Sequence, residues 1–151
     1  MSIPYNDKEL LESTKKHEGF RHTPYICSGG AQTIGYGTNL DAGITKRQAS
    51  ALMIQQHKDN LAWLAETYEW WHQLQDEQQR GIAEMVYQLG RTSFSKFKNT
   101  IAAIERKDYE AAAQGMENSL WARQTPNRVK HVAECMRSGI EPDLDLDEDE
   151  G

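Results

Sequence analysis

The spacing of polar and apolar residues predicts a mainly helical chain with one small region of strand. Asn6 and Glu9 have the spacing of a capping box, which predicts a helix over residues 7–19. Thr45 and Gln48 repeat this spacing and open a longer helix, whose apolar positions recur every three or four residues. The chain has 151 residues and carries no internal repeat, so we expect a single domain.

Further helices are predicted downstream, where apolar residues keep the same spacing and cap or stop residues bound the segments. The spacing gives four of them: one capped by Asp76 and stopped by Gly90, one through Phe94 and Ile104, one over residues 108–119, and one from Thr125-Pro126 to Gly139.

One segment between the first two predicted helices has the residue pattern of a β-hairpin. Residues 25–27 and 33–37 form short runs typical of strands, on either side of a glycine-rich stretch at 28–32. With a five-residue turn, Cys27 and Thr33 would be directly opposed, with Cβ atoms about 4.5–5.5 Å apart. A thiol and a hydroxyl would then share one small polar site.

Glu18 lies at the end of the first predicted helix, close to this hairpin. It follows Leu11 by two helical turns, so it shares a face with a leucine and we expect it to be partly buried. Apolar neighbours raise the pKa of a carboxyl group from about 4.3 towards about 6, where it can act as a general acid. With a water held by Cys27 and Thr33, this suits acetal hydrolysis with inversion, although the usual partner is a second carboxylate. On spacing alone, a purely structural interpretation of the three residues stays open.

The sequence around these residues resembles the catalytic segment of the T-even phage lysozymes, glycoside hydrolase family 24. His17-Glu18-Gly19, Tyr25 and the run from Gly30 to Gly37 carry the resemblance. The family pattern is Glu, eight residues, Asp or sometimes Cys, five residues, Thr, and Glu18, Cys27 and Thr33 have this spacing. Residues 85–90 and 119–130 extend the resemblance over most of the chain.

The resemblance implies an α+β, mainly α, lysozyme-like fold. A small N-terminal lobe with the hairpin would cover about 1–45, a connecting helix about 46–68 and a helical lobe about 69–140, with a cleft between the lobes. The implied function is that of an endolysin, a muramidase that hydrolyses the β-1,4 bond between N-acetylmuramic acid and N-acetylglucosamine in peptidoglycan. No metal or organic cofactor is implied, and a monomer is expected.

The resemblance also assigns roles to individual residues. Glu18 would be the general acid, and Cys27 and Thr33 would position the attacking water. The residues implied to bind the glycan are Tyr25, Gln88, Trp121 and Arg128, of which Arg128 would approach Glu18.

Two departures from the family leave alternatives open. The commoner catalytic Asp is Cys27 here, and Glu84 stands where the T-even protein has an amide. Without the family match, Arg128 would be read as solvated or as an ion-pair partner and Trp121 as a core residue. A non-catalytic peptidoglycan-binding or partner-docking protein on the same scaffold is the alternative function.

The distribution of charge along the chain changes this picture little. Seven of the 23 acidic residues lie at positions 141–151, so the net charge of -6 becomes +1 for residues 1–140, with 17 basic and 16 acidic groups. The acidic total argues against nucleic acid as a partner, since phosphate binding needs clustered Lys and Arg, and the tail is expected to be solvated and disordered. No apolar run spans about 20 residues, so we expect no membrane insertion. By the same resemblance, we expect the protein to stay in the host cytoplasm until a partner permeabilises the membrane. It would then act on the cell wall in the periplasm.

Overall fold

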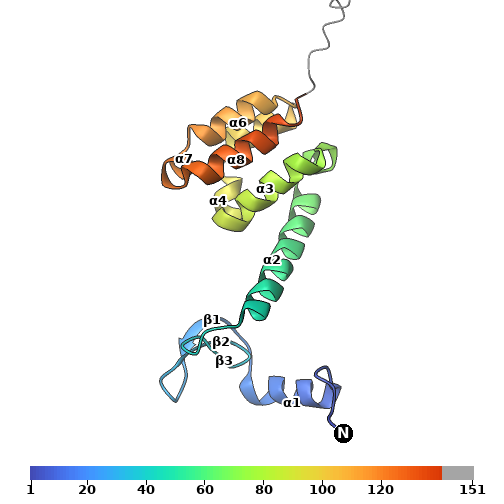
Figure 1. The fold of residues 1–151 in the computed structure, drawn as a ribbon, viewed down its shortest axis with the longest axis vertical. Helices are drawn as coiled ribbons and strands as arrows, with labels where there is room; N and C mark the ends of the chain where they lie inside the picture. Colours follow the sequence, from blue (N-terminus) through green and yellow to red (C-terminus); the bar gives the residue numbers. More distant parts are fainter. Residues whose placement is uncertain (141–151) are drawn as a thin grey trace, which may run out of the picture. The chain divides into compact units, whose positions relative to one another are not determined.

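The computed structural model describes residues 1–140 and separates into two compact units, residues 1–51 and a second unit that begins at Leu52. The fold is α+β, mainly α and lysozyme-like, as the sequence predicted. Figure 1 shows the three strands beside α1 in the first unit and the packed helices of the second. The acidic tail at 141–151 lies outside the described residues.

The first unit contains α1 (Lys8–Glu18) and an antiparallel sheet of β1 (Arg21–Ile26), β2 (Gln32–Gly35) and β3 (Thr38–Asn39), in that order. The helix is capped by Asp7, whose carboxylate accepts the Leu10 N–H at 2.9 Å. The predicted capping by Asn6 is therefore wrong by one residue, because the neighbouring aspartate offers an equally good acceptor.

The register of the hairpin differs from the prediction. Tyr25 pairs with Thr33, and the N–H of Cys27 donates to the carbonyl of Ala31 at 3.0 Å, which leaves a three-residue loop at 28–30. Gly30 has a φ of 88°, the left-handed conformation that ends such loops. Cys27 and Thr33 are therefore diagonal neighbours on one face of the sheet and not directly opposed.

The long helix α2 (Lys46–Thr67) starts as predicted. The Thr45 hydroxyl accepts the Gln48 N–H at 3.1 Å, and the Gln48 side chain accepts the Thr45 N–H at 2.9 Å. Leu64 is its one buried residue. The boundary between the two units falls within this helix.

The second unit is helical throughout its described part. Its elements are η1 (Glu69–Gln73), α3 (Asp76–Leu89), α4 (Arg91–Ser95), α5 (Lys98–Glu105), α6 (Tyr109–Glu117), α7 (Leu120–Gln124) and α8 (Pro126–Arg137).

Three boundaries in this unit correct the sequence prediction. Gln75, not Asp76, caps α3 through a reciprocal box with Gln78. The expected single helix through Phe94 is two, because Phe97 adopts a non-helical ψ of 60°. The short helix α7, capped by Ser119, was not predicted, since five residues are too few to show a period.

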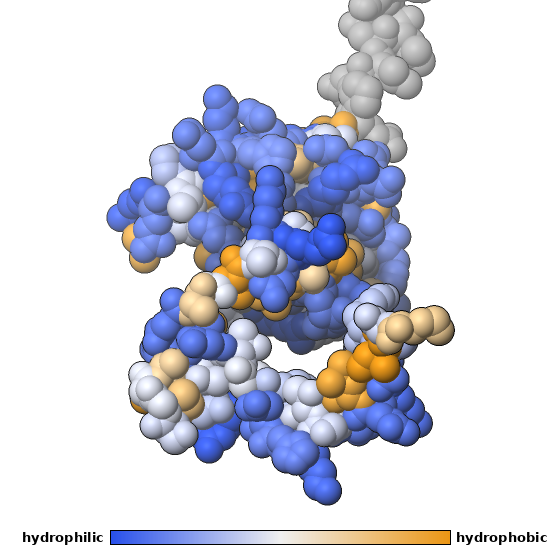
Figure 2. Space-filling view, turned by 60° about the horizontal axis from the view of Figure 1, so that its bottom comes forward, coloured by the Kyte–Doolittle hydropathy of each residue, from blue (hydrophilic) through white to orange (hydrophobic). Residues whose placement is uncertain are grey.

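Helix α8 is central to the second unit, and both α3 and α6 pack against it (Figure 1). A Cβ on Gly81 would lie 2.8 Å from the Cβ of Cys135, so this glycine lets α3 and α8 approach closely. Met85 on α3 and Met136 on α8 belong to the buried core, together with Trp70 and Trp71. Hydrophilic side chains cover most of the face of this unit seen in Figure 2.

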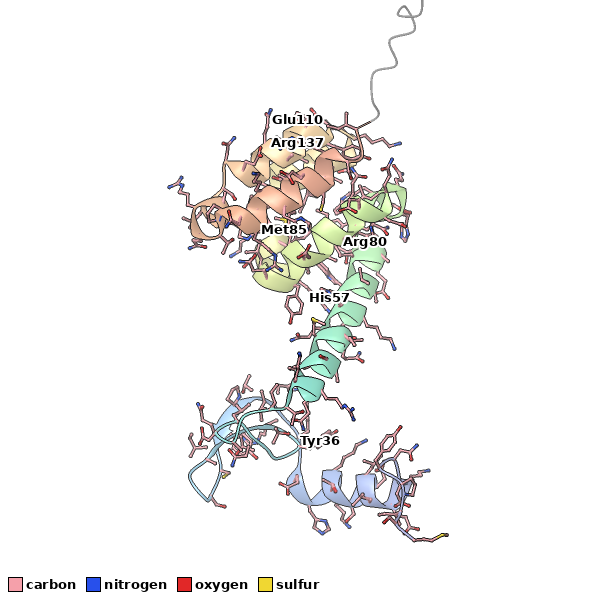
Figure 3. All side chains as sticks on the ribbon, viewed as in Figure 1. Tyr36, His57, Arg80, Met85, Glu110 and Arg137 are labelled. Atoms are coloured by element: carbon pink, nitrogen blue, oxygen red, sulfur yellow. The ribbon has the colours of Figure 1, made fainter. Side chains whose placement is uncertain are left out.

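Arg137 joins α8 to α6. Its guanidinium donates to both carboxylate oxygens of Glu110, at 2.8 and 3.0 Å, and to both of Glu117, at 2.9 and 2.7 Å (Figure 3). Arg137 lowers the pKa of each carboxyl group below its ordinary value by donating these hydrogen bonds.

Candidate functional site

Glu18 is the last residue of α1, and its carboxylate lies against the backbone of Gly37. Gly19 ends the helix with a φ of 70°, and its N–H donates to the Lys15 carbonyl at 2.9 Å. A Cβ added to Gly37, between β2 and β3, would lie 2.8 Å from the carboxyl carbon of Glu18. The bare backbone of Gly37 therefore provides the surface on which this carboxylate rests.

Glu18 is exposed, which corrects the expectation that it is partly buried. No residue of α1 is buried, and Leu11, which shares its face, is 42% exposed. A shared helix face fixes the direction of a side chain but does not supply atoms that cover it.

Thr33 and Cys27, the other two candidate catalytic residues, belong to the same unit as Glu18. Thr33, at 4% exposure, is the one buried residue among 1–51, and its hydroxyl donates to the Ala31 carbonyl at 3.0 Å. The Thr33 hydroxyl, with backbone groups at Ala31 and Gly29, holds the pKa of the half-buried Cys27 thiol below its usual value. A hydroxyl has one hydrogen, so the Thr33 hydroxyl can donate either to the Ala31 carbonyl or to the Cys27 thiolate, but not to both at once.

Tyr25 lies on the same sheet face, directly opposite Thr33. The guanidinium of Arg21 covers one face of its ring at 4.7 Å from the centroid. The half-buried ring is therefore fixed beside the polar pair, as a residue that contacts a glycan would need to be.

In the second unit, a line of polar contacts runs between α3 and the helices α7 and α8. The indole N–H of Trp121, which is 3% exposed, donates to the amide oxygen of Gln88 at 2.9 Å. The amide nitrogen of Gln88 donates to the Thr125 hydroxyl at 3.3 Å. Trp121 is thus a core residue with a satisfied donor, and it orients the Gln88 amide.

One turn earlier on α3, Glu84 binds two basic residues of α8. One carboxylate oxygen lies 2.9 Å from Nε2 of His131, and the other lies 3.5 Å from Nε of Arg128. That Arg128 nitrogen is buried and has no hydrogen-bond partner among residues 1–140. Arg128 is therefore an ion-pair partner of Glu84. Its approach to Glu18 would join the two units and stays a prediction.

Cys135, in the same line of contacts, has an environment opposite to that of Cys27. The Cys135 residue is 3% exposed, and its thiol donates to Glu77 at 3.4 Å. Burial, reinforced by Glu77, raises the pKa of this thiol to about 11. Cys135 is an inert structural thiol, whereas Cys27 is the one with increased thiolate character.

Two contacts went unnoticed in the sequence. The contact between Gly37 and Glu18 could have been suspected from the Gly35-Tyr36-Gly37 run, because glycines let a backbone approach another group closely. The His131–Glu84 pair had no such signal, because its members are 47 positions apart. Within residues 1–140, no group of three metal-ligating side chains is close enough to hold an ion, and no helix is both long and apolar enough to cross a bilayer.

A carboxylate at a helix end beside a small antiparallel sheet, in a chain with a helical second unit, is the arrangement of a lysozyme-like protein. The chain belongs to the phage lysozyme family, whose model matches residues 15–134.

Curated relatives agree with this assignment over shorter stretches. The chain is 35% identical over 69 residues to "Probable T4-type lysozyme 2" of Dictyostelium discoideum, a match that covers 46% of this chain and 41% of the relative. It is 40% identical over 50 residues to "Peptidoglycan hydrolase gp36" of Pseudomonas phage phiKMV, covering 33% of this chain and 6% of the relative. The matches span less than half the length of these relatives.

Proposed function

We propose that this protein is a phage-type endolysin, a muramidase that hydrolyses the β-1,4 bond between N-acetylmuramic acid and N-acetylglucosamine in peptidoglycan. The observation that carries the proposal is the placement of the Glu18 carboxylate on Gly37, at the family spacing from Cys27 and Thr33. Membership of the phage lysozyme family supports it. Release to the wall after membrane permeabilisation remains part of the proposal.

In the proposed reaction, Glu18 donates its proton to the glycosidic oxygen of the leaving sugar. A water held by Cys27 and Thr33 attacks the anomeric carbon from the opposite face and gives a proton to the Cys27 thiolate, so the product has inverted configuration. The lowered pKa of Cys27 increases its thiolate fraction, so its negative charge can stabilise the developing oxocarbenium ion. This gives Cys27 a function where the family more often has an aspartate.

Substrate binding is proposed for Tyr25 in the first unit and for Gln88 and Arg128 in the second, whereas Trp121, predicted to bind the glycan, is buried and orients the Gln88 amide. Gln88 offers an amide already oriented by Trp121, and Arg128 offers guanidinium N–H groups that Glu84 leaves free. N-acetyl and hydroxyl groups of a glycan are suitable partners for such amides and cations.

The test is the Glu18→Gln variant, compared with Glu12→Gln, an exposed glutamate on the same helix. Loss of the proton donor should reduce the rate of turbidity loss on permeabilised Gram-negative cells by at least about 100-fold. Glu12→Gln should retain the wild-type rate, and mass spectra of the products should show muramic acid reducing ends. A folded Glu18→Gln protein that lyses at the wild-type rate would overturn the mechanism. A wild type that binds peptidoglycan without cleaving it would establish the non-catalytic alternative.

A further inference from the structure

Helices α3 and α8 lie side by side (Figure 1) and share a cluster of polar side chains. Glu77 and Glu84 stand two turns apart on α3, so they lie on one face of this helix. Arg128, His131 and Cys135 follow one another on α8 at intervals of three and four positions and face these carboxylates. All five residues belong to the second unit, so the cluster is complete within one compact body.

The ring of His131 holds one oxygen of Glu84. Nε2 of the ring lies 2.9 Å from Oε2 of the carboxylate. A carboxylate only accepts hydrogen bonds, so Nε2 carries a hydrogen and donates it, whether or not the other ring nitrogen is protonated. The Cys135 sulfur lies 3.6 Å from the same nitrogen, but its thiol hydrogen goes to Glu77 at 3.4 Å. One oxygen of Glu84 is therefore committed to His131.

The other oxygen of Glu84 holds Arg128 only loosely. It lies 3.5 Å from Nε of Arg128, and this buried nitrogen has no hydrogen-bond partner among residues 1–140. A carboxylate that is free to turn towards a guanidinium forms two parallel hydrogen bonds of about 2.7–2.9 Å with it. The contact between Glu84 and Arg128 is single and longer, which is the geometry of a carboxylate drawn aside by a second partner.

We propose that His131 is a positioning residue for Arg128 and acts through Glu84. By holding one carboxylate oxygen, His131 prevents Glu84 from closing on the guanidinium with both oxygens. The terminal N–H groups of Arg128 then remain available to acceptor oxygens of the glycan. The use of Arg128 by the substrate rests on the proposed function, whereas the competition of His131 and Arg128 for Glu84 rests on the cluster alone.

Steady-state kinetics on peptidoglycan tests the role of His131. His131→Leu removes the donor and leaves Glu84 free to pair with Arg128 through both oxygens. KM should rise at least about tenfold, as expected when one hydrogen bond to a charged group is withdrawn from the substrate, and kcat should stay unchanged. His131→Gln keeps an N–H donor and should keep the wild-type KM. The matched control is Lys130→Leu, which removes the exposed neighbour of His131 on α8 and should also keep it.

A double variant distinguishes positioning from a merely structural role. With Glu84→Gln added to His131→Leu, no carboxylate is left to pair with Arg128, so KM should return to that of Glu84→Gln alone. A double variant with a KM as high as that of His131→Leu would overturn the inference. Melting curves identify variants that lose activity because they unfold, and His131→Ala, which adds no apolar surface, replaces the leucine variant if that variant melts early.

NMR of the Arg128 Nε–H group tests the same pairing without catalysis. The signal is assigned by its loss in Arg128→Lys. In His131→Leu, the closed pair with Glu84 should slow exchange of this hydrogen with water at least about tenfold, since a charged acceptor now holds it.

The two measurements separate this inference from the proposed function. Unchanged exchange, or a wild-type KM for His131→Leu, in a protein that cleaves peptidoglycan would overturn the inference alone. Slowed exchange in a protein that cleaves no peptidoglycan would support the competition for Glu84 and overturn the proposed muramidase.

Discussion

Gly37 offers a test of how the Glu18 carboxylate is positioned. Gly37 has a φ of 79°, and a Cβ there would fall 2.8 Å from the carboxyl carbon of Glu18. Gly43 has nearly the same φ, 77°, but a Cβ there meets nothing within 4 Å. Alanine at the two positions therefore imposes the same backbone strain, and only one of the substitutions displaces the proposed acid.

The strain should cost about 1–2 kcal/mol in either variant, because a Cβ disfavours the left-handed conformation. The atoms that meet the new Cβ at Gly37 are the flexible end of Glu18, which can swing aside, so the two variants should unfold at similar temperatures. A displacement of about 1 Å at a catalytic group can lower the rate about 100-fold. Gly37→Ala should therefore lose about 100-fold in lytic rate, and Gly43→Ala should keep it.

The assay pairs turbidity loss on permeabilised cells with thermal unfolding of both variants. Equal lytic rates for the two alanine variants, at equal stability, would refute the claim that Gly37 positions Glu18. A Gly37→Ala protein that is far less stable than Gly43→Ala would show that the Glu18 side chain cannot move aside, contrary to the steric argument.

Three further expectations follow from individual contacts. Iodoacetamide should alkylate Cys27 with a pH midpoint below that of an ordinary thiol and spare the buried Cys135 until unfolding, and equal labelling in peptide maps would contradict this. Gln88→Leu should lower stability by about 1–3 kcal/mol in urea titrations, because it leaves the Trp121 indole unpaired, while Gln88→Glu should lose less. Arg137→Met should destabilise the protein at neutral pH. Because Arg137 lowers the pKa of both its glutamates, this stabilisation is present above their unfolded pKa, near 4.3, and is lost as pH falls through the lowered folded values. An unfolding difference that grows towards low pH would contradict that sign.

Local signals predicted the start of α2 well, because the Thr45–Gln48 box depends on side chains that reach only three residues along the chain. The hairpin register was harder. Tyr25 pairs with Thr33, and the hydrogen bond from Cys27 to Ala31 then leaves a loop of three residues in place of the predicted five. Sequence spacing cannot decide between two loops that both contain glycines able to adopt a positive φ.

The candidate site likewise combines features that the local sequence determines with features that depend on tertiary contacts. The order and spacing of Glu18, Cys27 and Thr33 match the family pattern along the chain, but their roles in the reaction stay a prediction. The exposure of Glu18 and the pairing of Glu84 with His131 could not be predicted, because both depend on what the tertiary fold brings near a side chain. Hydrophobic periodicity predicts the side of the helix on which a side chain lies, but it does not identify the residues that the side chain contacts.

The two cysteines show why residue type alone was a poor guide to the chemistry of this chain. Cys135 is enclosed by core atoms and faces a carboxylate, and both effects disfavour its thiolate. Cys27 stands at a tight turn, where backbone groups and the Thr33 hydroxyl favour its thiolate. Those same groups would also stabilise the carboxylate that the family more often has at this position. The hairpin therefore supplies an environment suited to a negative charge, which either a thiolate or a carboxylate can provide, and this reconciles Cys27 with the proposed hydrolysis.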